Sequence, residues 1–149
     1  MNEIRFYRST GKYGFMSNLY PAEIVYNGLV FPSAEHLYQW RKTSNQKIKE
    51  WIRLAPFPRC AAIAGHGLFQ YDVVEGWTRM KIGVMREALD LKFSQHPGLA
   101  AKLLATGEAV LIEESNTDPF WGIGRNGTGL NTLGGLLMVI RDKINNGGK

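Results

Sequence analysis

The chain has 149 residues, 44% of them hydrophobic and 21% charged, which excludes a disordered polypeptide and suits one globular core. Its net charge of +5 comes from scattered basic residues, which favours phosphate-bearing ligands but gives no dense basic stripe for nucleic acid. The single cysteine, Cys60, excludes an intrachain disulfide, and no apolar run approaches the ~20 residues of a membrane span. The first residues also lack the apolar core of a signal peptide. We therefore expect a single cytoplasmic domain, residues 1–149, with no membrane partner.

The first half of the chain predicts short strands followed by helices. Asn27-Gly28 lies between two β-rich runs, the pattern of a two-residue type I′ hairpin turn. Ser33 follows a proline and can cap the next helix. The predicted elements are a strand at 2–8, a hairpin at 22–31, and helices at about 33–43, 46–54 and 59–64.

The second half is predicted to be mostly helical. Trp77, Met80 and Val84 recur at helical spacing and begin a long amphipathic helix. A last helix is expected to begin near Asn131 and to end just before Gly147. The other predicted elements are helices at 77–93 and 97–105 and a strand at 109–114. The total is an α+β fold, a mainly α-helical single domain with a small β-sheet.

The first polar constellation lies on the helix that contains "SAEHLYQWRK". Glu35, Tyr38, Gln39 and Lys42 fall within one arc of about 100°, because a helix has 3.6 residues per turn. Glu35 and Lys42 are two turns apart, about 10.5 Å along the axis, so they can converge on one ligand. The alternative is a solvated helix face that carries ordinary charges.

The second constellation is the glycine-rich segment that begins at Asp118. Gly122, Gly124 and their neighbours surround Trp121, and glycine lets backbone N–H groups approach a ligand closely. With the helix start near Asn131, these amides could hold a phosphate. The segment contains neither GxxxxGK[ST] nor a strand followed by GxGxxG, which disfavours nucleotide binding of those two kinds. The alternative is a surface loop made of turn residues.

Other polar residues give weaker signals. Ser17 and Asn18 lie between apolar residues in "GKYGFMSNLYP" and could bind a ligand or form a turn. The three histidines have no metal-like spacing with each other or with Cys60. Glu113 and Glu114 should point to opposite faces of a strand, and the sequence does not say which of them faces a site.

Four segments together resemble the NADAR family, whose relatives include bacterial riboflavin-intermediate N-glycosidases. They are "FMSNLYP", "FPSAEHLYQWRK", "WTRMKIGVMREALDLKFSQHP" with "LLATGEAVLIEES", and "DPFWGIGRNGTGLNTLGGLLMVIR". Their order and spacing extend the resemblance over nearly the whole chain, about residues 6–141. Trp40 and Arg41 depart from the usual family sequence, but the register of Lys42 is unchanged.

The resemblance implies an enzyme that hydrolyses the N-glycosidic bond between a phosphorylated ribose and a nitrogen base. One branch of the family acts on early riboflavin-pathway pyrimidine ribose phosphates, and another removes ADP-ribose from guanine in nucleic acid. It implies no metal and no other cofactor. Two alternatives are an ADP-ribosyl-guanine hydrolase, whose partner is modified nucleic acid, and a non-catalytic module that binds ADP-ribose or NAD. A structural domain without a small ligand is the least favoured alternative.

The resemblance also assigns roles to residues of this chain. It implies Lys42 as the nucleophile that forms a Schiff base at C1′, Glu35 as the group that moves protons, and Asp118 as an assisting carboxylate. The tryptophans are expected to stack on the base. The implied substrate-binding residues are Ser17, Asn18, Tyr38, Gln39, Trp77, Trp121, Gly122, Gly124 and Asn131.

Overall fold

The computed structural model describes residues 2–147 of the chain, which divides into two compact units. The terminal unit comprises Met1–Ser17 and His96–Lys149, and the central unit comprises Asn18–Gln95. Each unit contains one two-stranded sheet and its own helices. The predicted α+β, mainly helical fold class is confirmed, although the small sheet is in fact two separate sheets. The assignment of residues 1–149 to one domain stays a prediction.

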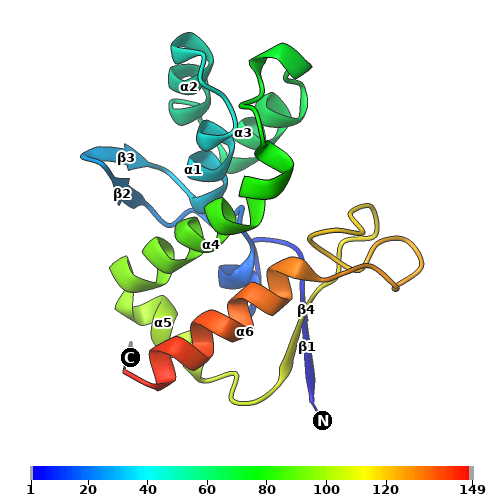
Figure 1. Cartoon of the computed structure of the whole chain (residues 1–149). Coiled ribbons are helices and arrows are strands. Elements are labelled where there is room, and N and C mark those ends of the chain that lie inside the picture. Colours follow the sequence, from blue (N-terminus) through cyan, green and yellow to red (C-terminus); the bar gives the residue numbers. More distant parts are fainter. Residues whose placement is uncertain (1, 148–149) are drawn as a thin grey trace. The chain divides into compact units, whose positions relative to one another are not determined.

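The terminal unit is built around a parallel strand pair (Figure 1). β1 pairs with β4 in a register that runs from Glu3 opposite Val110 to Phe6 opposite Glu113. Helix α6 packs against β4 and against α5, which buries Leu111, Leu137 and Ile140. The elements are β1 (Glu3–Phe6), η1 (Gly14–Met16), α5 (Pro97–Leu104), β4 (Val110–Glu113) and α6 (Thr132–Asn145).

The central unit is organised around helix α1, which packs against α2, α3 and α4. The β2–β3 hairpin supplies Ile24 and Phe31 to a core that also contains Leu37 of α1 and Ala88 of α4. Because α1 is surrounded in this way, its polar side chains are buried together with its apolar ones. The elements are β2 (Ile24–Tyr26), β3 (Leu29–Phe31), α1 (Ala34–Arg41), α2 (Gln46–Arg53), α3 (Pro58–His66), η2 (Gln70–Asp72) and α4 (Trp77–Gln95).

Local sequence signals placed several element boundaries correctly. Asn27 and Gly28 have φ values of 51° and 78°, as a type I′ turn between β2 and β3 requires. Ser33 caps α1, where its Oγ accepts a hydrogen bond from the backbone N–H of His36 at 3.2 Å. Gly147, with φ of 69°, follows α6 as predicted. Most predicted helices differ from the observed ones by one or two residues at their ends.

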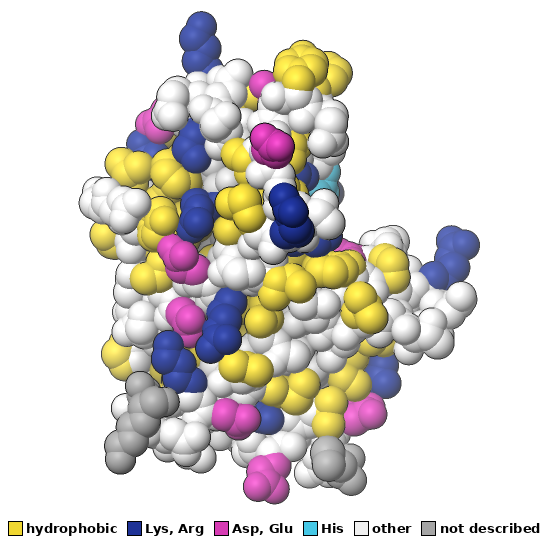
Figure 2. Space-filling view, in the orientation of Figure 1, with side chains coloured by type: hydrophobic (Ala, Val, Ile, Leu, Met, Phe, Trp, Pro, Cys, Tyr) yellow, Lys and Arg dark blue, Asp and Glu magenta, His cyan; other side chains and the backbone are white. Residues whose placement is uncertain are grey.

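The surface agrees with the scattered charge of the sequence. On the face drawn in Figure 2, Lys and Arg side chains alternate with acidic and hydrophobic ones and form no continuous basic stripe. Within residues 2–147, no helix has both the length and the apolar character needed to cross a membrane.

Candidate functional site

The polar face of α1 is buried, which excludes the solvated helix face that its composition also allowed. Glu35 is 8% exposed and Gln39 is 1% exposed. Lys42, at the C-cap of the helix, is half-buried. Burial of ionisable and amide side chains costs free energy unless they are hydrogen-bonded, so their partners matter.

Glu35 is held on both carboxylate oxygens by side-chain amides. Asn18 Nδ2 donates to Oε2 at 2.9 Å, and Gln39 Nε2 donates to Oε1 at 2.7 Å. The backbone N–H of Glu35 in turn donates to the carbonyl of Asn18 at 3.2 Å. Glu35 also lies in the first turn of α1, where the helix dipole favours a negative charge. Two side-chain amides therefore fix the carboxylate in position, and no residue between 2 and 147 forms an ion pair with it.

Lys42 lies at the other end of the same helix. Its Nζ donates to the carbonyl oxygen of Gly65 at 3.0 Å. Burial is the main cause that lowers the pKa of Lys42; the nearby Glu35 carboxylate raises this pKa, and the Lys81 ammonium lowers it further. A lysine with a lowered pKa has a larger neutral fraction at a given pH, and only the neutral amine is a nucleophile.

Tyr38 and Trp77 pack against each other in the central unit. Their ring centroids are 5.2 Å apart with an interplanar angle of 54°, and both side chains are buried. Around α1, the side chains of Asn18, Glu35 and Gln39 form one hydrogen-bonded group, and the Lys42 side chain bonds separately to Gly65 of α3. We name the group of Asn18, Glu35, Gln39, Lys42 and Gly65 the α1 cluster.

In the terminal unit, Asp118 holds the backbone of its own loop. Its Oδ1 accepts hydrogen bonds from the backbone N–H groups of Phe120 at 2.8 Å and Trp121 at 2.9 Å. This is an Asx-type turn, which orients the Trp121 indole edge-on against the Phe120 ring at a centroid distance of 4.7 Å. The structure thus gives Asp118 a local structural role, and its catalytic role stays a prediction.

Asn131 links the same loop to strand β4. It has a left-handed φ of 52°, its Nδ2 donates to the Leu111 carbonyl at 2.9 Å, and its Oδ1 accepts from the Glu113 N–H at 2.9 Å. Its side chain thereby continues the hydrogen bonding of the strand edge. The predicted substrate contact of Asn131 stays a prediction, since both ends of its amide already bind protein backbone.

The backbone amides at the start of α6 also have protein partners. The N–H of Thr132 donates to the Phe120 carbonyl and that of Leu133 to the Trp121 carbonyl, both at 3.1 Å. These amides were expected to help hold a phosphate, and a phosphate could reach them only by displacing those carbonyls. Backbone hydrogen bonds therefore join the two ends of the loop, at residues 120–121 and 132–133.

Two glycines of the loop have structural explanations: close packing at Gly122 and backbone conformation at Gly124. A Cβ at Gly122 would lie 2.3 Å from Glu113 Oε2, so the loop can pass this carboxylate only where a side chain is missing. Gly124 has φ of 70°, which favours glycine. The two neighbouring glutamates have different surroundings. Glu113 faces Gly122, whereas Glu114 is exposed and pairs with Arg5.

Ser17 is buried at the end of η1, where its backbone N–H donates to the Gly14 carbonyl at 3.0 Å. It belongs to the terminal unit, whereas Asn18, the next residue, belongs to the central unit. The structure therefore gives the predicted "SN" pair two different surroundings. Asn18 contacts a predicted catalytic group, Glu35.

Two residues near Lys42 were not identified from the sequence. Gly65 accepts the Lys42 hydrogen bond, and Lys81 influences the Lys42 pKa. Lys81 could have been found, because it lies one helical turn after Trp77 on the same predicted helix. For Gly65 the only signal is a glycine inside a helical stretch, which frequently has a packing reason.

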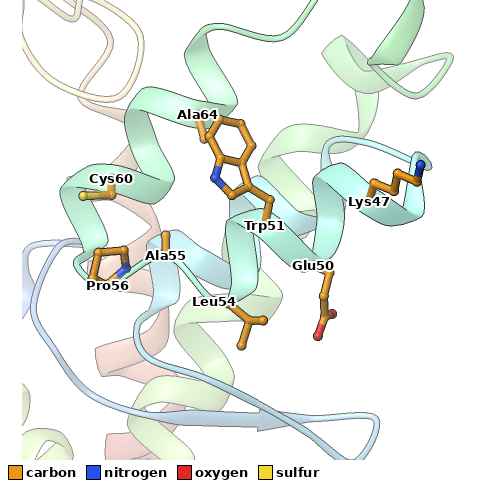
Figure 3. Close-up of a pocket in the computed structure, with 8 residues that line it drawn as sticks. All are labelled: Lys47, Glu50, Trp51, Leu54, Ala55, Pro56, Cys60 and Ala64. Carbon is orange, nitrogen blue, oxygen red and sulfur yellow. The ribbon is translucent and has the colours of Figure 1, made fainter.

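A separate pocket of about 450 Å³ lies between α2 and α3 (Figure 3). The Trp51 indole extends from α2 toward Ala64 of α3, and half-buried Cys60 lines the same hollow. No predicted site residue lines this pocket. Lys47 and Glu50 also line this pocket, and both residues are exposed.

Comparisons with known proteins agree with the resemblance found in the sequence. The family model of the NADAR domain matches residues 5–145. The N-glycosidase YbiA of Shigella boydii is 40% identical over 141 residues, which cover 95% of this chain and 88% of that protein. A riboflavin biosynthesis protein of Vibrio vulnificus is 36% identical over 95% of this chain but only 38% of its own length.

The fold also matches a solved structure. The NMR structure of Escherichia coli YbiA superimposes with a TM-score of 0.89 and is 38% identical, covering 98% of this chain and 86% of that one. The N-glycosidase homologues bear out the expected enzyme class, a hydrolase acting on N-glycosyl bonds. With both the family model and these relatives matching almost its full length, the chain belongs to the NADAR domain family.

Proposed function

We propose that the chain hydrolyses the C1′–N bond between a phosphorylated ribose and a nitrogen base. The observation that carries the proposal is the α1 cluster, in which a buried carboxylate is held on both oxygens and an amine with a lowered pKa lies on the same helix. Breaking a C1′–N bond places positive charge on the sugar and negative charge on the base. A nucleophile for C1′ and a group that delivers a proton to the base are the two functions that this reaction needs.

In the proposed mechanism, neutral Lys42 Nζ attacks C1′. The C1′–N bond breaks, and the base leaves with the bonding electrons and takes up a proton delivered through Glu35. Nζ loses its two protons as it forms an imine with C1′: one reaches the base through Glu35, and the other goes to the ring oxygen as the ribose ring opens at its C1′–O bond. Water then adds to C1′, the C1′–Nζ bond breaks, and the sugar phosphate leaves with the free amine restored. The net reaction consumes one water.

The proposed substrates are riboflavin-pathway pyrimidine ribose phosphates. The similarity to a riboflavin biosynthesis protein supports this choice over ADP-ribosylated nucleic acid. The lack of a continuous basic stripe on the face in Figure 2 points in the same direction. Trp77 of the central unit is proposed to contact the base, and the substrate contacts expected of Ser17, Trp121, Gly122 and Gly124 in the terminal unit stay predictions.

A substrate panel with Lys42→Ala tests the proposal. Free base is measured by mass spectrometry after incubation with pyrimidine ribose phosphates and, in parallel, with ADP-ribosylated DNA. We expect base release from the first set and a loss in Lys42→Ala of more than ~10³-fold in kcat. The exposed Lys47, changed to alanine, is the matched control and should keep full activity.

Borohydride trapping separates the possible mechanisms. Reduction in the presence of substrate should add the sugar phosphate to wild-type protein at Lys42 and not to Lys42→Ala. Near-full turnover by Lys42→Ala would rule out the Schiff-base route and leave attack by water. Binding of ADP-ribose without any base release over hours would instead identify a non-catalytic module.

A further inference from the structure

Gly65 lies inside α3 and is buried against the side chain of Gln39. A Cβ built on Gly65 would lie 1.9 Å from Gln39 Oε1, 2.3 Å from Cδ and 2.9 Å from Cγ. These separations are far below van der Waals contact, so the Gln39 side chain occupies the space that a side chain at position 65 would need. Gln39 in this position donates its hydrogen bond to Glu35 at 2.7 Å.

The carbonyl group of Gly65 has a separate contact. It accepts the hydrogen bond from Lys42 Nζ at 3.0 Å. Because α3 ends at His66, this carbonyl belongs to the last helical turn, whose carbonyls have no N–H partner within the helix. The negative end of the helix dipole also lies here and favours a cationic donor. Gly65 therefore contacts one proposed catalytic group, Lys42, and also Gln39, which holds the other group, Glu35.

Helix geometry gives no other reason for a glycine at this position. Gly65 does not have a positive φ, and alanine is favoured over glycine inside a helix by about 1 kcal/mol. Alanine would thus suit the backbone of α3 better. An alanine at position 65 would require the buried Gln39 side chain to move.

We propose that Gly65 is a positioning residue of the proposed glycosidase site. Its missing side chain admits the Gln39 carboxamide that orients Glu35, and its carbonyl holds the Lys42 amine between turnovers. The inference rests on the proposed function for its catalytic consequence. The structural part, the coupling between Gly65 and Gln39, stands independently of that function.

The first experiment compares Gly65→Ala with Gly83→Ala. Gly83 is an exposed helical glycine of α4 whose Cβ would meet no atom within 4 Å, so it controls for the change in helix propensity. We expect Gly65→Ala to lower kcat by ~10- to 100-fold, because small displacements of catalytic groups have effects of this size. KM should change less than kcat, and Gly83→Ala should leave both unchanged. Equal kcat values for Gly65→Ala and wild type would overturn the proposal.

A double-mutant cycle with Gln39→Ala tests the route of the effect. Removing the Gln39 carboxamide also removes the collision, so Gly65→Ala should lower kcat no further in a Gln39→Ala background. An additional loss of the same size in that background would show that Gly65 acts through something other than Gln39. If Gly65→Ala alone fails to fold, the double variant should fold again, and a double variant that stays unfolded overturns the proposal.

The NMR signal of the Gln39 side-chain amide gives a readout that needs no substrate. We expect its resonances to move in Gly65→Ala and to stay in place in Gly83→Ala. An unmoved signal in Gly65→Ala overturns the coupling between the two residues. A moved signal in a protein that releases no base from any substrate would support the coupling while refuting the proposed function.

Discussion

Glu35 in the central unit and Asp118 in the terminal unit are both carboxylates that accept two hydrogen bonds, but their donors differ. Glu35 accepts from the side chains of Asn18 and Gln39, one on each oxygen. Asp118 accepts from two successive backbone amides of its own loop on one oxygen. Hydrogen bonds to nearby backbone fix a turn, as in Asx turns generally. Hydrogen bonds from the side chains of Gln39, one helical turn away, and of Asn18, 17 residues away, fix the Glu35 carboxylate itself.

The same contrast separates the amides of the two units. The Asn131 side chain forms hydrogen bonds with the backbone of β4 through both its N–H and its oxygen. Gln39 gives its N–H to a carboxylate, and its Oε1 has no hydrogen-bond donor within the described chain. Buried polar groups that lack a hydrogen-bond partner sometimes belong to functional sites. The side chains of Asp118 and Asn131 therefore bond to the backbone around the Trp121 loop, whereas the side chains of Glu35 and Gln39 bond to each other.

Of the two carboxylates, Glu35 should show the larger effect when it is changed, in Glu35→Gln. Removing the carboxylate should lower kcat by ~10²–10⁴-fold, because a group that transfers protons contributes about this much. Asp118→Asn keeps an acceptor for the Phe120 and Trp121 amides and should lose much less activity. Steady-state kinetics of both variants on one substrate make the comparison. A greater loss in Asp118→Asn than in Glu35→Gln would reverse the assignment of roles.

Buried cations extend the comparison to stability. Lys92 is fully buried with its Nζ 5.6 Å from the Tyr20 ring centre, and burial lowers its pKa to about 7. Arg141 of the terminal unit is 7% exposed and donates to Thr106 Oγ1 at 2.8 Å and the Ala109 carbonyl at 2.9 Å. The lysine can lose its proton as the chain folds, whereas an arginine stays charged.

Lys92 should therefore make stability depend on pH. Between about pH 7 and 10.5 the unfolded chain keeps the proton that folded Lys92 has lost, so stability rises with pH through this window. The slope from one such group is at most ~1.4 kcal/mol per pH unit. Denaturant unfolding across this range should show this rise in the free energy of unfolding in the wild type. Lys92→Met should lack the contribution. Parallel pH profiles for the two proteins would contradict the assignment.

A smaller effect is expected from Asn131→Ala. The change leaves the Glu113 N–H and the Leu111 carbonyl without their side-chain partner and puts alanine at a left-handed φ. We expect the free energy of unfolding to fall by ~2–4 kcal/mol. Asn126→Ala, at an exposed residue of the same loop, is the control and should change it by less than ~0.5 kcal/mol. Stability unchanged in Asn131→Ala would mean that the loop does not depend on this residue.

The sequence predicted most of the fold, because its signals are local. Ser33 as a cap and Asn27-Gly28 as a turn act through contacts within a few residues. The α1 cluster was predicted only in part. Helical spacing put Glu35, Gln39 and Lys42 on one face, but their burial depends on helices that pack from elsewhere in the chain. Gly65 was missed for the same reason, since its contact with Gln39 joins two helices 26 positions apart (65 − 39).

For the glycine-rich loop, the sequence predicted the backbone conformation but not the hydrogen-bond partners of the amides. Its composition correctly indicated unusual backbone geometry at Gly124, but the pattern left open both a phosphate site and a surface loop made of turn residues. What separates the two is whether the amides already have partners. The N–H groups of Thr132 and Leu133 each bind a carbonyl twelve residues earlier in the chain, a pairing that composition does not encode.

The smallest expected effect is a shift in the pH profile of Lys42. Lys81→Gln removes a positive charge that lowers the Lys42 pKa, so the pKa should rise and the neutral amine should appear at higher pH. Glu35→Gln removes a negative charge that raises this pKa, so the same profile should move to lower pH. The rate of reductive methylation of Lys42, followed by mass spectrometry against pH, measures both without substrate. Each shift should be below about one unit, less than a tenfold change in rate at fixed pH. Lys47→Gln should leave the profile in place, and shifts of the same sign in Lys81→Gln and Glu35→Gln would mean that charge is not what tunes the amine.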